Sequence, residues 1–588
     1  MATTNHKKET LKAERLITDH LDIWTSAIEQ KSSAGRGSSK KFSLHGIKKL
    51  RELILELAVR GKLVEQNASD EPASVLLERI ATEKAQLLQE GKIKKPKILP
   101  EITEDEKPFE LPDGWEFSRF IDILDFSGGG QPPKSVFSEE KLDGYVQLIQ
   151  IRDLGVNPQP VYVPKDKVSK FCTINDVMVG RYGASVGKVF WGKEGAYNVA
   201  LIRIHNELNA YHNGFVYQLL KSPLGQKMFT GISRSAQDGF NKDDIAPCIL
   251  PLPPVEEQHR IVAKVDELMS LCDALEAQTE SSLTAHQTLV ETLLNALLKP
   301  DNHQEAFQQS WQRISEHFDT LFTTNASIDT LKQTILQLAV MGKLVPQNPS
   351  DEPAAKLLER IAAEKAQLIK DKKIKKQKPL PDITDEEKPF ELPKGWEWCR
   401  VWQIAELITS GSRDWAKYYA DTGAIFVTMG NLAKGDYKLR LEALRYVSPP
   451  IGGEGLRTKL IKDDLLISIT GDVGNLGLIP DGFGEAYINQ HTCLLRFMHD
   501  CKNRYFPELM RSPLANFQFN APQRGIKNSF RLGDVGEMII PIPPLEEQHR
   551  IVAKVDELMA LCDQLKTRLT DAQTTQVQLA DGIVEQAL

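Results

Sequence analysis

The chain has 588 residues, of which 41% are hydrophobic and 26% are charged, a length sufficient for several packed units and a composition ordinary for a globular protein. No run of about 18 apolar residues occurs, which excludes a hydrophobic membrane-spanning segment. Seven cysteines and the absence of an apolar signal segment predict a reducing, cytoplasmic location. The net charge of −7 excludes a uniformly basic nucleic-acid binder, although residues 117–250 and 399–540 each carry two more basic than acidic side chains, which is compatible with DNA contact.

The first segment, residues 1–110, is predicted to be helical. Apolar residues from Leu50 to Ala58 recur at helical spacing and predict a helix ending near Gly61, and a second helix is expected from Ala73 to Leu88. The basic stretch Lys92–Lys97, repeated at residues 372–378, could contact DNA phosphates or an acidic partner, and it is equally consistent with a solvated linker.

The next segment, residues 111–250, is predicted to be a globular α/β module. Strand-like runs at residues 145–151, 177–180 and 197–204 are separated by turns, and one helix is expected around residues 214–228. The module is followed by residues 251–300, which are predicted to form one long helix. Pro254 and two glutamates fit the first turn of that helix.

The apolar residues of this long helix are spaced 4-3-4-3, which is a heptad seam and is typical of helices that pair. A single helix over residues 255–298 would be on the order of 65 Å long at ~1.5 Å per residue. The alternative is an amphipathic helix that packs only on its own module. The expected seam residues are Ile261, Val265, Leu268, Cys272 and Leu275 here, and Ile551, Val555, Leu558, Cys562 and Leu565 in the last segment of the chain.

The second half of the chain repeats the first. Residues 338–398 match 57–117 without a gap, with 44 identities in 61 positions, and residues 541–563 match 251–273, with 20 identities in 23. The repeat predicts a second helical segment at 301–391, a second module at 392–540 and a second long helix at 541–588. Between the matched pieces only a skeleton of similarity remains, so one scaffold carries two modules with different surfaces, as two related but distinct recognition events require.

The order of these segments is cyclic. The helical segment that would follow the last long helix opens the chain instead, so a closed pseudo-two-fold body with two antiparallel long helices between the modules satisfies the order. Such a body would present its modules in the way that duplex DNA presents two half-sites. The expected fold class is therefore α/β, with two globular modules separated by long antiparallel coiled-coil helices.

Glycine-containing loops in the modules are the candidate contact segments. Residues 128–135 and 410–413 each combine glycines with polar and basic side chains, and a plain surface turn is the alternative. Residues 180–188 resemble a phosphate-binding loop, but the spacing is wrong and Val189 replaces the required hydroxyl residue, so no nucleotide site follows. The set His491, Cys493, His499 and Cys501 has no counterpart in the first module and lacks the usual zinc-finger spacing, which favours a structural role over zinc binding.

Catalytic signatures are missing from the sequence. It contains no Walker A, H-E-x-x-H, G-x-S-x-G or C-x-x-C motif, and no Asn-Pro-Pro-aromatic tetrapeptide of the kind that adenine methyltransferases carry. We therefore expect a non-catalytic chain that binds no metal or cofactor itself. A coiled-coil adaptor whose modules bind proteins, and a DNA-modifying enzyme with an unrecognised site, are the two alternatives.

The tracts PLPPVEEQHRIVAKVDELMSLCD and PIPPLEEQHRIVAKVDELMALCD, with the paired LAVRGKLV and LAVMGKLV segments, resemble the specificity subunit of type I restriction–modification systems, in particular its longer-chain group. The resemblance covers nearly the whole chain. It implies two target-recognition domains that each read half of a bipartite asymmetric site in double-stranded DNA, with the long helices setting the spacer and docking methyltransferase subunits. Restriction/translocase subunits would join that complex, and S-adenosylmethionine, ATP and magnesium would bind to the partner subunits.

Loop position and residue type select the candidate DNA-binding residues, because guanidinium, ammonium, amide and hydroxyl groups contact base edges and phosphates. In the first module the candidates are Gln131, Lys134, Ser135, Arg152, Arg181, Tyr182, Lys188, Asn241 and Lys242. In the second module they are Arg413, Lys434, Thr470, Asn475, Arg524, Lys527, Asn528 and Arg531.

Overall fold

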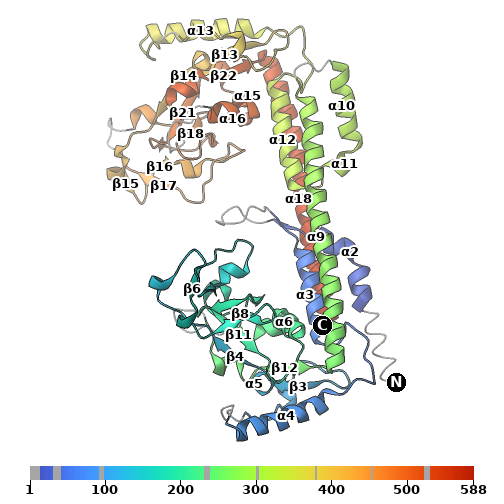
Figure 1. Cartoon of the computed structure of the whole chain (residues 1–588). Coiled ribbons are helices and arrows are strands. Elements are labelled where there is room, and N and C mark those ends of the chain that lie inside the picture. Colours follow the sequence, from blue (N-terminus) through green and yellow to red (C-terminus); the bar gives the residue numbers. More distant parts are fainter. Residues whose placement is uncertain are drawn as a thin grey trace. The chain divides into compact units, whose positions relative to one another are not determined.

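The computed structural model describes residues 13–30, 42–91, 99–230, 239–299, 304–377, 380–449, 452, 455–521 and 530–588 (Figure 1). The chain forms two compact units. Unit 1 comprises residues 1–282 and 571–588, and unit 2 comprises residues 283–570. Two long helices, α9 (Val255–Leu297) and α18 (Leu545–Ala587), each contribute to both units. Helix α9 passes from unit 1 into unit 2 and α18 passes from unit 2 into unit 1, which confirms the predicted opposite directions of the two helices.

Unit 1 joins the start of the chain to the end of α18, as the cyclic order predicted. The His45 Nε2 atom lies 3.0 Å from a carboxylate oxygen of Asp581, and the Arg60 guanidinium donates to the Leu588 carbonyl at 3.0 Å. The helical elements of this segment are α2 (Leu21–Ser26), α3 (His45–Val59) and α4 (Ala73–Gln89), and the short strands β1 (Glu29–Gln30) and β2 (Phe42–Ser43) form a two-stranded sheet.

The module of unit 1 contains two four-stranded sheets. A separate antiparallel pair, β3 (Glu116–Arg119) with β12 (Ile249–Leu252), connects the two ends of the module to the helical scaffold. The first sheet has the order β4 (Asp125–Gly128), β11 (Leu201–His205), β8 (Val177–Gly180) and β9 (Val189–Trp191). The second has the order β6 (Tyr162–Pro164), β5 (Tyr145–Ile149), β10 (Gly195–Tyr197) and β7 (Phe171–Cys172), and the helices are α5 (Phe120–Ile123), α6 (Asn213–Lys221), α7 (Pro223–Lys227) and α8 (Lys242–Ile245).

Unit 2 repeats this architecture. Its scaffold consists of α10 (Gln304–Glu316), α11 (Phe318–Leu321), α12 (Asn325–Val340) and α13 (Ala354–Lys370), and its module is framed by β13 (Glu397–Arg400) paired with β22 (Ile539–Ile542). One sheet has the order β14 (Ala405–Ser410), β21 (Thr492–Phe497), β18 (Leu465–Ser468) and β19 (Leu476–Leu478). The other has the order β15 (Tyr419–Ala420), β17 (Arg445–Val447), β16 (Ala424–Val427) and β20 (Ala486–Ile488), and the helices are α14 (Val401–Ile404), α15 (Tyr505–Arg511), α16 (Pro513–Asn520) and α17 (Leu532–Glu537).

Equivalent polar contacts hold the scaffold in the two units. Arg260 pairs with the buried Asp70 at 2.6 Å in unit 1, and Arg550 pairs with Asp351 at 2.6 Å in unit 2. Other repeated pairs are Arg51–Asp273 with Lys332–Asp563, and Arg119–Glu106 with Arg400–Glu387. The near-identical sequence segments therefore fold into near-identical frames, which leaves the difference between the units to the modules.

The heptad seam is buried, but each long helix packs against more than one element. Of the predicted seam residues, Leu275, Leu558 and Leu565 are half-buried and the other seven are buried. In unit 2, Ile551 and Val555 share one core with residues of α12, of the module and of the last turns of α9, including Val290 and Leu294. In unit 2 the seam of α18 therefore packs both against α9 and against the module that precedes α18. Both packing modes expected from the sequence, pairing of the long helices and packing on a module, are present.

The helix expected around residues 214–228 is two helices, α6 and α7. Ser222 caps the second helix by accepting from the Gly225 backbone N–H, and Pro223, which has no N–H to donate, occupies the first helical position. Ser512 and Pro513 break the equivalent helix of unit 2 in the same way.

Candidate nucleic-acid interface

The loops with candidate contact residues in unit 1 meet at one end of the first sheet. In the antiparallel registers Gly128 lies opposite Ile202, and Gly180 lies opposite Leu201, so β4 and β8 end where β11 begins. The second sheet reaches the same place, because the Asn198 N–H donates to the Ile149 carbonyl at 3.1 Å. We call the loops at this end edge 1, defined as residues 129–136, 150–154, 181–188 and 198–200.

Gly129 shows how closely these loops approach one another. A Cβ atom at this position would lie 2.1 Å from the Asn198 carbonyl oxygen, and the equivalent Gly411 of unit 2 would place one 2.0 Å from the Ile488 carbonyl oxygen. Only glycine permits that approach of two backbones. Gly129 and Gly411 therefore fix the loops against the neighbouring strand connection.

Several candidates of the first module gather at edge 1. Arg181 donates through Nε to the Phe240 carbonyl at 3.1 Å, and its guanidinium lies 5.1 Å from the centre of the Tyr182 ring. This arrangement holds the half-buried arginine at the surface beside an exposed aromatic ring. The exposed members of the set are Gln131, Lys134, Ser135, Arg152, Tyr182 and Lys188.

The other two candidates of the first module have structural roles. The Asn241 side chain caps α8 by accepting from two backbone N–H groups of its first turn. Lys242 forms an ion pair with Asp125 at 2.6 Å, and Asp125 lies opposite His205 at the far end of the sheet. Lys242 therefore lies away from edge 1, and its charge already has a partner.

Unit 2 has the same construction. Ser410 lies opposite Cys493 and Ser468 lies opposite Thr492, so the loops after β14 and β18 and the turn before β21 share one end of the sheet. The parallel pair of Val427 with Ile488 brings the end of β16 to the same place. We call these loops edge 2, defined as residues 411–418, 428–435, 469–475 and 489–491.

Four candidates of the second module, Arg413, Lys434, Thr470 and Asn475, lie at edge 2 in different environments. Arg413 and Lys434 are exposed, whereas the Thr470 hydroxyl lies 2.8 Å from His491 Nδ1. Asn475 is half-buried, and its Oδ1 atom has no hydrogen-bond partner among the described residues. Arg531 is exposed at the start of α17, and the remaining candidates, Arg524, Lys527 and Asn528, lie outside the described residues.

Sequence reasoning missed Gln490 and the place of His491 in a loop of edge 2. The Gln490 amide nitrogen lies 2.9 Å from His491 Nε2, so the imidazole bridges Gln490 and Thr470. The sequence pattern of His491, Cys493, His499 and Cys501 favours a structural role over zinc binding, and the structure agrees. Cys493 is fully buried and burial raises its pKa, whereas His499 is exposed, so the four residues do not form a common site.

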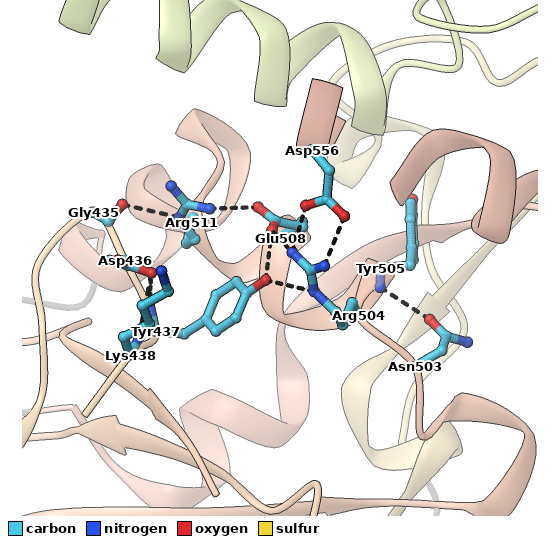
Figure 2. A network of polar contacts seen from close by, with 10 residues as sticks. All are labelled: Gly435, Asp436, Tyr437, Lys438, Asn503, Arg504, Tyr505, Glu508, Arg511 and Asp556. Atoms are coloured by element: carbon cyan, nitrogen blue, oxygen red, sulfur yellow. Dashed lines mark hydrogen bonds and ion pairs between the residues drawn. The ribbon is translucent and has the colours of Figure 1, made fainter. Parts of the chain in front are cut away.

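A second missed feature is a buried polar cluster behind edge 2 (Figure 2). The Tyr437 hydroxyl donates to the Glu508 carboxylate at 2.8 Å and accepts from Arg504 Nε at 2.8 Å. Arg504 also makes two hydrogen bonds with Asp556 of α18, and Arg511 donates to Glu508 at 2.6 Å. We call these five residues the Tyr437 cluster. No linear motif could reveal it, because its members come from three distant segments.

Glu257 and Glu547 are equivalent buried carboxyl groups of the scaffold that have unequal environments. Glu547 accepts from Trp396 Nε1 at 3.0 Å and from Gln347 at 3.4 Å. In the equivalent place, Glu257 is 1% exposed, and neither its Oε1 atom nor Trp115 Nε1 has a hydrogen-bond partner within the described part of unit 1. Burial raises the pKa of Glu257 to about 7, although the nearby indole and the Arg260 guanidinium oppose the rise.

The described ranges contain neither a metal-binding cluster nor a membrane-spanning helix. No group of three or more His, Cys, Asp or Glu side chains there could hold a metal ion. None of the described helices combines the length and the hydrophobicity needed to cross a lipid bilayer. Burial raises the pKa of the seam thiols, Cys272 and Cys562, to about 11, as expected for small apolar packing residues.

Comparison with known proteins agrees with the duplicated architecture. The family model for the type I restriction modification DNA specificity domain matches twice, at residues 112–285 and 393–572. The specificity subunit of the Escherichia coli type I restriction enzyme EcoAI is 40% identical over 98% of this chain and all of its own, and that of EcoEI is 39% identical over the same shares. The solved HsdS subunit from Thermoanaerobacter tengcongensis aligns over 82% of this chain and 98% of its own, with 18% identity and a TM-score of 0.38. The chain belongs to the family of type I restriction–modification DNA specificity subunits.

Proposed function

We propose that this chain determines the DNA sequence specificity of a type I restriction–modification enzyme. Each module reads one half of a bipartite, asymmetric site in double-stranded DNA. The observation that carries the proposal is the combination of two near-identical frames with two different sets of loops at the same end of equivalent sheets. The shared frame would bring both modules to the DNA in the same orientation, and their different loops would contact different bases.

Edge 1 and edge 2 supply the contacts in this proposal. At edge 1, Arg181 and the exposed Lys188 reach the duplex, with Tyr182 beside them. At edge 2, Arg413 and Lys434 have the corresponding role. Guanidinium groups read guanine through two hydrogen bonds, and ammonium groups neutralise phosphates.

The chain itself performs no chemistry in this proposal. S-adenosylmethionine, ATP and magnesium bind to the partner subunits, which are the methyltransferase (modification) and restriction/translocase subunits. The absence of methyltransferase and nucleotide-binding motifs from the sequence supports this division. The raised pKa values of the buried cysteines also argue against a thiolate nucleophile.

The long helices set the number of unspecified base pairs between the half-sites and dock the methyltransferase subunits. Each helix passes from one unit into the other without a break, which supports a rigid spacer. Inserting one heptad at matched positions of α9 and α18 is expected to change the spacing of the half-sites and leave their bases unchanged. An unchanged spacing would refute the spacer role.

The test is adenine-methylation mapping of genomic DNA from cells that contain the partner subunits with or without this chain. The proposal predicts a two-part motif that appears only when the chain is present. Replacing residues 118–250 with another module is expected to alter one half-site only. If methylation stays unchanged although the chain is bound to active partners, the modules do not read DNA, and the protein-binding adaptor becomes the better explanation.

A further inference from the structure

The two modules differ in the connection that carries Lys434. In unit 1, residues 155–161 join the short helix Ile151–Leu154 to β6, whereas in unit 2 the longer segment 432–444 joins the short helix Met429–Asn431 to β17. Lys434 is exposed within this longer segment. A longer connection has more conformations to lose, so a defined position for Lys434 requires specific anchors.

Both neighbours of Lys434 are anchored through their backbones. Ala433 exchanges two hydrogen bonds with Leu476 of β19, each 2.9 Å long. On the other side, the Gly435 carbonyl accepts from Arg511 Nε at 3.0 Å. The first anchor is a strand contact, and the second depends on one side chain of the Tyr437 cluster.

Tyr437 completes the attachment of the segment. Its carbonyl accepts from the Leu478 N–H at 2.8 Å, and its hydroxyl bonds to Glu508 and Arg504. The guanidinium groups of Arg504 and Arg511 lie 5.8 Å and 5.5 Å from the centre of its ring, within the range of cation–π attraction. Figure 2 shows the tyrosine pointing from the segment toward the helix that carries Glu508.

The Tyr437 cluster is expected to add little to the stability of the module, and its main effect is to fix the positions of the groups that it joins. The Glu508 and Arg511 side chains are 4% and 13% exposed, so this ion pair has lost most of its hydration, whereas Arg504 and Asp556 remain nearly half exposed. Buried ion pairs seldom stabilise a protein more than apolar residues would, because desolvation offsets their attraction. Their hydrogen bonds are directional, however, and Arg504 extends the network to Asp556 on α18.

The equivalent place in unit 1 has a different set of residues. In the sequence of unit 1, Arg504 is replaced by Gly214, Glu508 by Gln218 and Arg511 by Lys221. There Gln218 reaches Asp266, the equivalent of Asp556, directly at 3.3 Å, and Lys221 lies 4.9 Å from the centre of the Tyr217 ring. Asp556 therefore belongs to the repeated frame, whereas the other four residues of the cluster belong to the variable part of unit 2.

We infer that the Tyr437 cluster positions Lys434 and thereby determines specificity at the half-site read by the second module. The inference rests on the proposed function. Tyr437, Glu508 and Arg511 act as positioning residues, because they hold the anchored backbone segment next to Lys434 and are not themselves among the residues of edge 2. Lys434, a compact ammonium group, then meets a phosphate or base edge from a fixed direction.

The experiment compares Tyr437→Phe with Tyr505→Phe in the full complex with the partner subunits. Both changes remove one hydroxyl from a buried tyrosine of the same module, and among the described residues the Tyr505 hydroxyl bonds only the Pro541 carbonyl, at 3.0 Å. Methylation is measured on the cognate site and on sites with one changed base in either half. Hydrogen exchange of residues 432–444 is followed in the same samples.

Tyr437→Phe is expected to reduce discrimination at the second half-site by about tenfold, the size expected for the loss of a hydrogen bond to a charged group. It should leave the first half-site unchanged and speed exchange in residues 432–444. Tyr505→Phe should do neither. Arg511→Lys keeps a charge beside Glu508 and loses the bond to the Gly435 carbonyl, so it gives the same test if Tyr437→Phe does not fold.

Three outcomes would overturn the inference: unchanged base preferences in Tyr437→Phe and Arg511→Lys, equal relaxation at both half-sites, or the same effect in Tyr505→Phe. The first half-site serves as an internal control in every sample. A wild-type complex that shows no bipartite motif refutes the proposed function instead, and the exchange data then still decide whether the cluster holds the segment.

Discussion

The unequal environments of Glu257 and Glu547 allow a quantitative prediction. The pKa of Glu257 is about 7 in the folded chain, against an ordinary value of 4.5. The folded state therefore binds more protons than the unfolded state between these two pH values, and stability falls as the pH rises through this window. A difference of this size corresponds to about 3 kcal/mol, which is lost in full above pH 7 and retained below pH 4.5.

Glu257→Gln removes the ionisation without changing the shape of the side chain. We expect the variant to match wild type near pH 4.5 and to exceed its free energy of unfolding by up to about 3 kcal/mol at pH 8. Glu547→Gln is the matched control. Burial raises the pKa of Glu547 as well, but this carboxylate accepts from Trp396 and Gln347, so its replacement should gain less.

Urea unfolding of the full chain, followed by peptide-resolved hydrogen exchange, separates the two units, because α3 reports on unit 1 and α12 on unit 2. Subtracting the wild-type curve from that of each variant cancels the titration of all other groups. A stabilisation by Glu257→Gln that is the same at pH 5 and pH 8 would refute the reasoning. An equal gain from Glu547→Gln would show that the missing hydrogen bond has no part in it.

Three further predictions concern the modules. Asp464 is fully buried and accepts two 2.7 Å hydrogen bonds from Arg496. Asp464→Asn should therefore lower the free energy of unfolding, measured with urea, by about 3 kcal/mol. An unchanged unfolding midpoint would contradict this prediction. Gly129→Ala would place a methyl group 2.1 Å from a backbone carbonyl, so methylation assays should show altered recognition of the first half-site only, and an unaltered first half-site would show that the loop adapts. Arg181→Ala should weaken methylation at the first half-site at least tenfold, whereas Lys242→Ala, whose charge is paired with a carboxylate, should not; equal losses would mean that edge 1 is wrongly placed.

The sequence was sufficient to predict the scaffold because the scaffold obeys local rules. The long helix predicted over residues 255–298 is α9, which spans Val255–Leu297, and the predicted helix from Ala73 to Leu88 is α4, which ends at Gln89. Periodicity, proline position and the near-exact repeat are all visible in the linear chain. The cyclic order followed from the repeat alone, and the contact of His45 with Asp581 confirms it.

The site was harder to predict because the register of the paired strands decides which loop residues lie together at one end of a sheet. Arg181 and Lys242 look alike in the sequence, yet only Arg181 lies at edge 1, because the pairing of β4 with β11 places Asp125 and its partner Lys242 at the other end. Asn241 likewise has the composition of a DNA contact and the geometry of a helix cap. The Tyr437 cluster joins residues separated by more than sixty positions, which no local pattern encodes.

The division of α18 between the units has a consequence for biosynthesis. Residues 283–570, which form unit 2, leave the ribosome before residues 571–588, which complete unit 1. The segment translated first therefore makes its contacts with residues 571–588, such as those of His45 with Asp581 and of Arg60 with Leu588, only after unit 2 has been synthesised. Chaperones and premature termination should thus act mainly on unit 1, even though most of its residues are the first to be made.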